Sequence, residues 1–420
     1  MRINDNFGLD VGSSQETTTI LDTTLSYGLL KETQIDTLQF DLSGIVRLGE
    51  VPGQSQNVDV DDPNAFFAYT RDGANSRLAT DARIRRVDLN FDDPLRVQDQ
   101  LNSNSLIIDD GTRTTSRLNF AWENGINDAV GYGFDLQYLD ESFEDTTDPG
   151  LFDNDELRSE VFGTFRFTST ATGRLSYSRI DYEADDTLQE ERETQELLFD
   201  LTYAVNPITD VSVRVGYADI EETDITPFTT EEDGLTGGLT VTRSLTNGFA
   251  AIGIDTGVAI TGRRTNFDVT RSFLLKGGSF DATLGVTRGP SGDIDPIGQI
   301  GYNYTLANGS IGAAFVRDFR NDVQGNDIRS TRATLSYLTD INPVSSLDFR
   351  VGYGQVDDAG NGSVTDTDNT TFRATYIRAL NADWNLSAGY EYRHRFEEGV
   401  GSAKSNEIFF SLDRFFVVQR

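Results

Sequence analysis

The side chains that usually carry covalent or acid–base chemistry are scarce in this sequence. It has no Cys and a single His, His394, in the stretch YEYRHRF. A hydrolase that activates Ser through an imidazole base needs such a His beside its nucleophile. By alternation, however, His394 falls with Tyr390, Tyr392 and Phe396 on one apolar face. We therefore predict that the chain is not an enzyme and that it holds no cofactor.

Pairs of adjacent carboxylates are the next candidates for chemistry. They occur at 61–62, 109–110, 190–191 and 231–232. Such pairs can act as general acid and base, or as ligands of Ca²⁺. None follows the spacing Asp-x-Asp-x-Asp-Gly, so we interpret them as solvated loop charge and predict no dedicated metal site.

The overall charge is strongly acidic and excludes one class of partner. The 420 residues include 35 Lys and Arg against 68 Asp and Glu, a formal net charge of -33. Nucleic-acid binding depends on basic side chains that neutralise phosphates, so no nucleic acid is expected as a partner. A hydrophobic content of 37% with high charge is typical of disordered chains, but 10% aromatic residues and 39 Gly oppose that interpretation.

Strands must position these charges, because apolar and polar residues alternate along most of the chain. The alternation is clear over 38–48, 130–138, 197–205 and 384–392. A period of two places successive side chains on opposite faces of a strand, whereas a helix would need a period near 3.6. The sequence therefore predicts an all-β fold.

The connections between the predicted strands alternate in length and charge. Short turns fall near 31–34, 72–75, 123–128, 169–172, 206–209, 246–248, 276–278, 307–309, 340–343 and 380–383. Longer acidic loops lie between them, at 140–156, 181–193, 219–233 and 356–368. Short turns at one end of the strands and long loops at the other fit a soluble β-sandwich, propeller or solenoid, or a transmembrane β-barrel.

Composition favours the barrel. The polar face is rich in Gly, Ser, Thr and Asn, as a water-filled lumen requires, and the apolar face is rich in Tyr, Phe and Leu, as a lipid-facing surface requires. We predict one domain, residues 1–420, that forms an antiparallel up-and-down transmembrane barrel. It has about 22 strands (an even number, 20–22), from 2–12 to 405–417. An even number places both termini at the end with short, periplasmic turns and leaves the long acidic loops extracellular.

The last predicted strand carries an aromatic pattern near its end. It reads SNEIFFSLDRFFVVQR, with Phe410, Leu412 and Phe416 on one face. This resembles the C-terminal assembly signal of bacterial outer-membrane β-barrels. The opening stretch, RINDNFGLDVGSSQETTTILDTTLSYGLLKETQ, is similar to the first strands of porin-type barrels found beside exopolysaccharide-export systems. The resemblance implies a location in the cell outer membrane, with lipid, lipopolysaccharide and the barrel-assembly machinery as partners. From the opening residues alone, we expect no signal peptide ahead of the first strand in this sequence.

The polar face is where function is expected. By parity, its charged residues form a set of candidate pore-lining side chains: Arg47, Arg83, Arg85, Arg117, Asp135, Arg166, Asp200, Arg214, Asp255, Asp281, Arg332, Asp348, Arg350, Arg373, Glu391 and Arg393. Such charges tune ion or solute selectivity, although they also form ion pairs that brace the wall.

Two functions follow from these expectations. The first is an outer-membrane channel that passes hydrophilic solutes or exports polysaccharide. The alternative is a surface adhesin or structural barrel that acts through its acidic loops, where divalent cations are a further expected partner.

Overall fold

A computed structural model describes most of the chain: residues 1–6, 9, 11, 17–50, 58–89, 111–146, 150–225, 229–321, 326–360, 365–414 and 416. Within these ranges every regular element is a β-strand, and all the strands belong to one sheet. No described segment forms a helix of the length and apolar character needed to cross a membrane.

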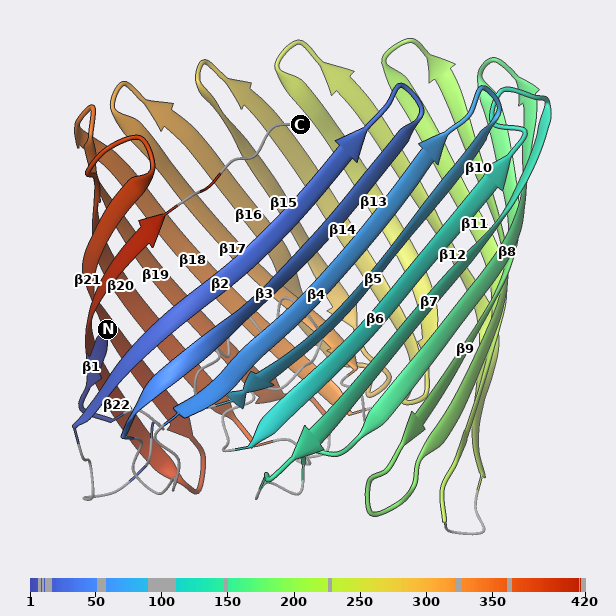
Figure 1. Ribbon diagram of the computed structural model, residues 1–420. Coiled ribbons are helices and arrows are strands. Elements are labelled where there is room, and N and C mark those ends of the chain that lie inside the picture. The colour runs from blue at the N-terminus through green and yellow to red at the C-terminus, as the bar shows by residue number, and fades with distance from the viewer. Residues whose placement is uncertain are drawn as a thin grey trace.

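The sheet is a closed antiparallel barrel of 22 strands in chain order (Figure 1). Each strand pairs with its sequence neighbours, and β1 closes the ring by pairing with both β2 and β22. This confirms the predicted fold class and strand number. The strands are β1 Arg2–Asn4, β2 Thr18–Glu32, β3 Asp36–Glu50, β4 Val58–Asp72, β5 Ser76–Asp88, β6 Thr112–Asn124, β7 Val130–Glu144, β8 Asn154–Thr168, β9 Ala171–Ala184, β10 Glu191–Asn206, β11 Thr209–Thr223, β12 Thr229–Leu245, β13 Gly248–Ala259, β14 Gly262–Leu275, β15 Gly278–Arg288, β16 Ile294–Leu306, β17 Gly309–Asn321, β18 Asp327–Asn342, β19 Ser345–Asp358, β20 Thr367–Ala379, β21 Trp384–Glu397 and β22 Gly401–Arg414.

The first strand differs from the prediction. β1 has 3 residues, Arg2–Asn4, where the sequence predicted a strand over 2–12. Its antiparallel register places Met1 opposite Phe410 in the wall, so the first residue does not reach the short-turn end. The reason is local: residues 5–6 already bend, and alternation in this stretch is too short to define a strand.

The alternation of connection lengths holds with two exceptions. Connections 260–261 and 398–400 lie at the end that carries the long loops, yet they are short. The acidic loops are also shorter than predicted, because the strands continue into them: the connection predicted at 140–156 spans 145–153. Acidic side chains at strand ends are therefore part of the wall.

The two faces of the wall have opposite chemistry. On one face lie large apolar side chains that are exposed in the isolated barrel, such as Leu25 (66%), Leu235 (63%) and Leu284 (63%). The alternate positions of the strands point to the other face and carry charged side chains. Asp200, for example, lies opposite Arg214 on the neighbouring strand. An apolar outer surface of this extent needs lipid around it, which is the arrangement of a transmembrane barrel.

Candidate functional site: the charged lumen face

The structure places all sixteen predicted pore-lining residues on the face opposite the exposed apolar one. Residues that lie opposite one another on neighbouring strands share this face around the barrel. Arg83 lies opposite Arg117, Asp200 opposite Arg214, and Arg373 opposite both Arg350 and Glu391. Because each pair shares one face, the parity read from single strands describes a continuous inner surface.

Six of the sixteen meet at one cavity, where the barrel closes. It has a volume of about 1020 Å³ and is lined by Arg47, Arg85, Arg350, Arg373, Glu391 and Arg393. The remaining ten are distributed along the wall outside this cavity. We call it the closure cavity. Its lining also includes charged residues that sequence reasoning missed as pore-lining, namely Arg2, Asp22, Asp61, Asp62, Glu407, Asp413 and Arg414.

A bulge in β4 explains why Asp61 and Asp62 were misinterpreted. The register between β3 and β4 shifts between Ser43 and Ile45, and Asp62 has a φ of 47° just before Pro63. A bulge puts an extra residue on one strand, so two consecutive side chains can face the same side. Both carboxylates therefore lie in the wall as lumen charges, not in a solvated loop. The sequence Asp-Asp-Pro inside a strand was the available signal, because Pro is tolerated at bulges.

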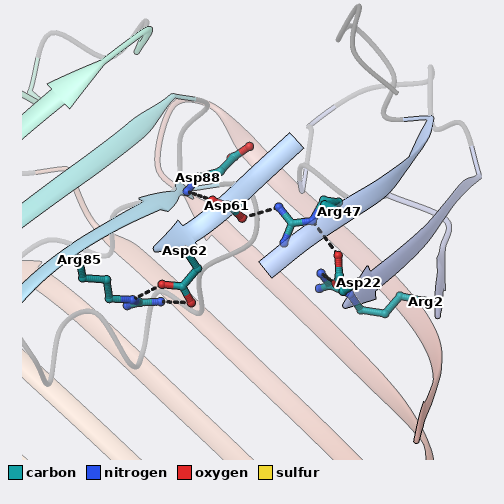
Figure 2. Close-up of polar contacts among 7 residues, drawn as sticks. All are labelled: Arg2, Asp22, Arg47, Asp61, Asp62, Arg85 and Asp88. Atoms are coloured by element: carbon teal, nitrogen blue, oxygen red, sulfur yellow. Dashed lines mark hydrogen bonds and ion pairs between the residues drawn. The ribbon is translucent and has the colours of Figure 1, made fainter. Parts of the chain in front are cut away.

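These carboxylates belong to a chain of ion pairs that crosses β1 to β5 (Figure 2). Arg47 contacts Asp61 and, through Nε, Asp22 at 2.9 Å; Arg2 contacts Asp22 as well. The side chains of Arg47 and Asp61 are each 7% exposed.

The chain of ion pairs continues onto β5. Arg85 binds Asp62 with two nitrogens, at 2.6 and 3.1 Å, and Asp61 accepts a hydrogen bond from the Asp88 amide at 3.1 Å. A bidentate contact of this kind fixes the orientation of both side chains. The network therefore holds five strands in register.

A second network lies on the other side of the closure. Glu391 contacts Arg373 at 3.3 Å and Arg393 at 3.9 Å. The Arg373 guanidinium stacks over the Phe409 ring with its carbon 4.5 Å from the ring centroid. That ring in turn lies against Gly389, where a Cβ would come within 2.5 Å of the Ala374 carbonyl oxygen and closer still to the ring. The glycine thus makes room for an inward aromatic side chain that supports the arginine.

Asn4 joins β1 to the second network. Its Nδ2 donates to Glu407 at 3.3 Å, and its Oδ1 accepts from the Ser405 hydroxyl at 2.9 Å. Both contacts are buried, with Asn4 1% exposed. A strand of 3 residues is therefore held by side chains as well as by its backbone pairs.

Several of the predicted pore residues form contacts that brace the wall. Asp200 pairs with Arg214 at 3.1 Å, and Asp348 pairs with Arg350 at 2.8 Å. Arg166 donates to two backbone carbonyls of the neighbouring short turn, at 3.0 and 2.9 Å, and so anchors that turn.

The strands β13–β15 form a contrasting surface, which we call the acidic sector. Its inward carboxylates are Asp255, Asp268 and Asp281, and no ion pair among the described residues involves them. Glycines occupy the cross-strand positions beside them, for example Gly238 beside Asp255 and Gly301 beside Asp281. Within the described part of the chain, these carboxylates therefore face the lumen without a basic partner.

The predicted C-terminal assembly signal is only partly in a strand. Phe410 and Leu412 are outward residues of β22, 52% and 57% exposed. Phe416 lies beyond the end of the strand, because β22 ends at Arg414, and it is 74% exposed. The Arg414 guanidinium stacks on the rings of both Trp384 and Phe416, with its carbon 5.2 and 4.3 Å from the two ring centroids. The strand therefore ends on an aromatic–arginine cluster.

The acidic loops contain one titrating group with an unusual environment. Glu190, in the connection between β9 and β10, is 8% exposed and lies 3.3 Å from Arg192. Burial raises the pKa of Glu190 to about 7, while the positive charge of Arg192 acts against that rise. Across the described residues, no group of three or more His, Asp and Glu has the geometry of a metal site. Cation binding at the acidic loops remains a prediction.

Comparisons with known proteins identify the fold. No family model and no curated protein matches the sequence. Among solved structures, the FrpB iron transporter from Neisseria meningitidis (F5-1 variant) has a TM-score of 0.58 at 9% identity, over 99% of this chain and 82% of that one. The open form of the ferric-catecholate import receptor Fiu from E. coli K12 gives 0.59 at 10%, over 99% and 81%. The ferric yersiniabactin uptake receptor FyuA from Yersinia pestis gives 0.53 at 11%, over 94% and 79%.

The shared feature is the barrel fold. At this level of identity the similarity extends to the fold alone. The apolar outer surface and the 22-strand barrel together place the chain in an outer membrane, as the sequence predicted. The titles of these three structures describe an iron transporter and two receptors for iron uptake, and none of the three names a porin, so the resemblance to porin-type barrels stays a prediction.

Proposed function

We propose that this barrel carries a hydrophilic solute across the outer membrane through its lumen. The observation that carries the proposal is the separation of chemistry between the two faces. Sixteen predicted charged residues share the inner face, while the outer face is apolar. Charged side chains that line a hydrated passage select solutes by sign and size. Catalysis is not part of this proposal.

The comparisons support transport in general terms. The titles of the similar structures describe an iron transporter and import receptors for ferric siderophores. Barrels of 22 strands are wide enough to enclose a lumen beyond the reach of wall side chains. Passive passage and polysaccharide export are narrower forms of the proposal. Lipopolysaccharide, outer-membrane lipid and the assembly machinery are its expected partners.

Conductance in a planar lipid bilayer tests the proposal. The purified barrel should give discrete ohmic steps, and Arg350→Gln with Arg373→Gln should shift ion selectivity toward cations. Both arginine side chains line the closure cavity and are at least half exposed. A silent bilayer, from protein whose folding is shown by heat-modifiable gel migration, would contradict the channel and favour the adhesin or structural barrel.

Liposome swelling separates the narrower forms. A passive channel should admit small neutral sugars at rates that fall steeply with size. A polysaccharide exporter should also admit long oligosaccharides. Swelling with ions but not with sugars would leave transport in place and reject polysaccharide as the solute.

A further inference from the structure

The strands β13–β17 carry charges of opposite sign on their two faces. The exposed side chains of Phe267, Leu284 and Phe315 identify the outward positions, because side chains alternate along a strand. The inward positions carry aspartates: Asp255, Asp268, Asp281, Asp295 and Asp318. At the outward positions, which all lie in the described part of the chain, the charged residues are arginines alone: Arg263, Arg271, Arg288 and Arg317. We call this outer surface the basic panel, and its charge is opposite to the net charge of -33 of the whole chain.

Three of these arginines lie at the end of the strands that carries the long loops. Arg263 is the second residue of β14, Arg288 is the last residue of β15, and Arg317 lies four residues before the end of β17. Arg271 lies toward the opposite end, where its Nη2 donates to Asn247 in a short turn at 2.8 Å. Because the long loops of a transmembrane barrel are extracellular, the three arginines lie near the headgroups of the outer leaflet.

The three arginines have no carboxylate partner among the described residues. A neighbouring arginine, Arg264, is paired with a carboxylate at 3.0 Å. None of the ion pairs in the described part of the chain involves Arg263, Arg288 or Arg317. The first two side chains are exposed, and Arg317 is half-buried, with Nη1 donating to the Thr331 hydroxyl at 3.1 Å. These guanidinium groups therefore have donors that an anion can use.

Apolar side chains continue the basic panel toward the centre of the membrane. Each of the three arginines has an exposed apolar residue on its own strand, two or four positions nearer the centre: Phe267, Leu284 and Phe315. Hydrocarbon covers such residues favourably, and an anionic group above it lies beside the arginines. An amphiphile with an anionic head therefore matches both parts of this surface.

The outer surface of β10–β12 provides a contrast at the same end of the barrel. Carboxylates lie directly opposite one another there, with Glu221 between Glu193 and Glu231, and Asp219 opposite Asp233. Like charges in these positions repel one another, and they repel an anionic headgroup as well. Anionic lipid is therefore expected on one side of the outer surface and not all around it.

We propose that the basic panel binds the phosphates of a lipid headgroup in the outer leaflet through Arg263, Arg288 and Arg317. The planar guanidinium group donates two parallel hydrogen bonds to a phosphate, which makes arginine well suited to this ligand. The proposal depends on the position of the barrel in the outer membrane and not on transport through its lumen.

The spacing of the arginines indicates the kind of headgroup. Arg263 and Arg288 are diagonal neighbours across the β14–β15 pair, about 7–8 Å apart. Arg317 lies opposite Gly298 on β16, four residues from Ile294, which lies opposite Arg288. Four residues of a strand span about 13 Å. A headgroup with two separated phosphates therefore fits the basic panel better than a headgroup with one.

Native mass spectrometry of the purified 420-residue barrel in a neutral detergent tests the proposal, with diphosphoryl lipid A as the probe. The test variant removes the three arginines: Arg263→Gln, Arg288→Gln and Arg317→Gln. The matched control removes the same charge from exposed side chains at the short-turn end, which also make no described ion pair: Arg243→Gln, Lys276→Gln and Arg378→Gln. We expect the apparent Kd to rise at least about tenfold in the test variant and to stay unchanged in the control.

Further arms separate a lipid site from other outcomes. Lipid A without its phosphates should bind the unmodified barrel as weakly as diphosphoryl lipid A binds the test variant. Lys at the three positions should restore most of the binding, and heat-modifiable gel migration checks that every variant is folded. Equal losses in the test variant and the control would overturn the proposal. Complete displacement of lipid A by an excess of inorganic phosphate would also overturn it, because the basic panel would then be a site for free anions.

Discussion

Inward carboxylates have opposite surroundings in two parts of the wall. In the closure sector, β19–β22 with β1–β5, Asp61 and Asp62 each contact an arginine that is at most 8% exposed. In the acidic sector, β13–β15, the carboxylates of Asp255, Asp268 and Asp281 lie beside glycines and make no described ion pair. The same residue type therefore holds strands together in one sector and faces solvent in the other.

The difference follows from the neighbours that each strand offers. Arginine in a cross-strand or diagonal position neutralises a carboxylate and fixes its orientation. Glycine in that position offers no charge to pair with and makes room for the carboxylate side chain, as Gly253 does for Asp268. We expect the closure sector to determine stability and the acidic sector to influence passing ions.

The largest expected effect is the loss of Arg47. Arg47→Met leaves Asp22 and Asp61 without that partner, and breaking a buried pair in this way costs about 3–5 kcal/mol. Denaturant unfolding in detergent micelles, followed by tryptophan fluorescence, measures the free energy of unfolding. Asp281→Asn is the matched variant from the acidic sector and should change it by less than about 0.5 kcal/mol. Equal effects in the two variants would remove the distinction between the sectors.

Two glycines provide a steric version of the same comparison. At Gly389 a Cβ would collide with the Phe409 ring and with the Ala374 carbonyl oxygen, whereas at Gly301 it would meet nothing within 4 Å. Gly389→Ala should therefore destabilise the barrel by about 1–3 kcal/mol. Gly301→Ala should be neutral or slightly stabilising, because it removes freedom from the unfolded chain. The same unfolding assay checks both, and a neutral Gly389→Ala would show that the Phe409 ring moves without cost.

Ion selectivity tests whether the carboxylates of the acidic sector act on passing ions. Asp255→Asn with Asp281→Asn should lower the preference for cations, because unpaired carboxylates attract them. The change in permeability ratio should stay below about fivefold for each carboxylate removed, since a hydrated charge at 4 Å contributes about 1 kcal/mol. Reversal potentials across a KCl gradient give the ratio. An unchanged potential would place these carboxylates away from the ion path.

The smallest expected effect concerns Glu190, which lies outside both sectors. Its pKa of about 7 exceeds the ordinary value of 4.5, so the folded state holds the proton more tightly than the unfolded state. The favourable contribution of Glu190 to folding stability is complete below pH 4.5, and it is lost as the pH rises through 7. Glu190→Gln should therefore protect the 185–190 connection from hydrogen exchange at pH 8 and change little at pH 4.5. A larger effect at the acidic pH would contradict the assigned shift.

Much of this barrel could be predicted from the sequence. Alternation assigned every candidate pore residue to one face, because side-chain direction in a strand depends only on parity. Short turns were located by Gly and Asn. The prediction failed where a bulge interrupts the alternation of side chains or where a strand ends. The bulge at Asp62 turned two adjacent carboxylates inward, and Arg414 ended β22 before Phe416.

The sequence by itself determined an all-β chain, its strand number and the polarity of its two faces, since these are local properties of strands and turns. The tertiary structure alone decided which charges meet. Asn4 and Glu407 are 403 positions apart, and only ring closure brings them to 3.3 Å. The pairing of β1 with β22 could not be predicted from alternation, because register between distant strands depends on the whole barrel and not on any one segment.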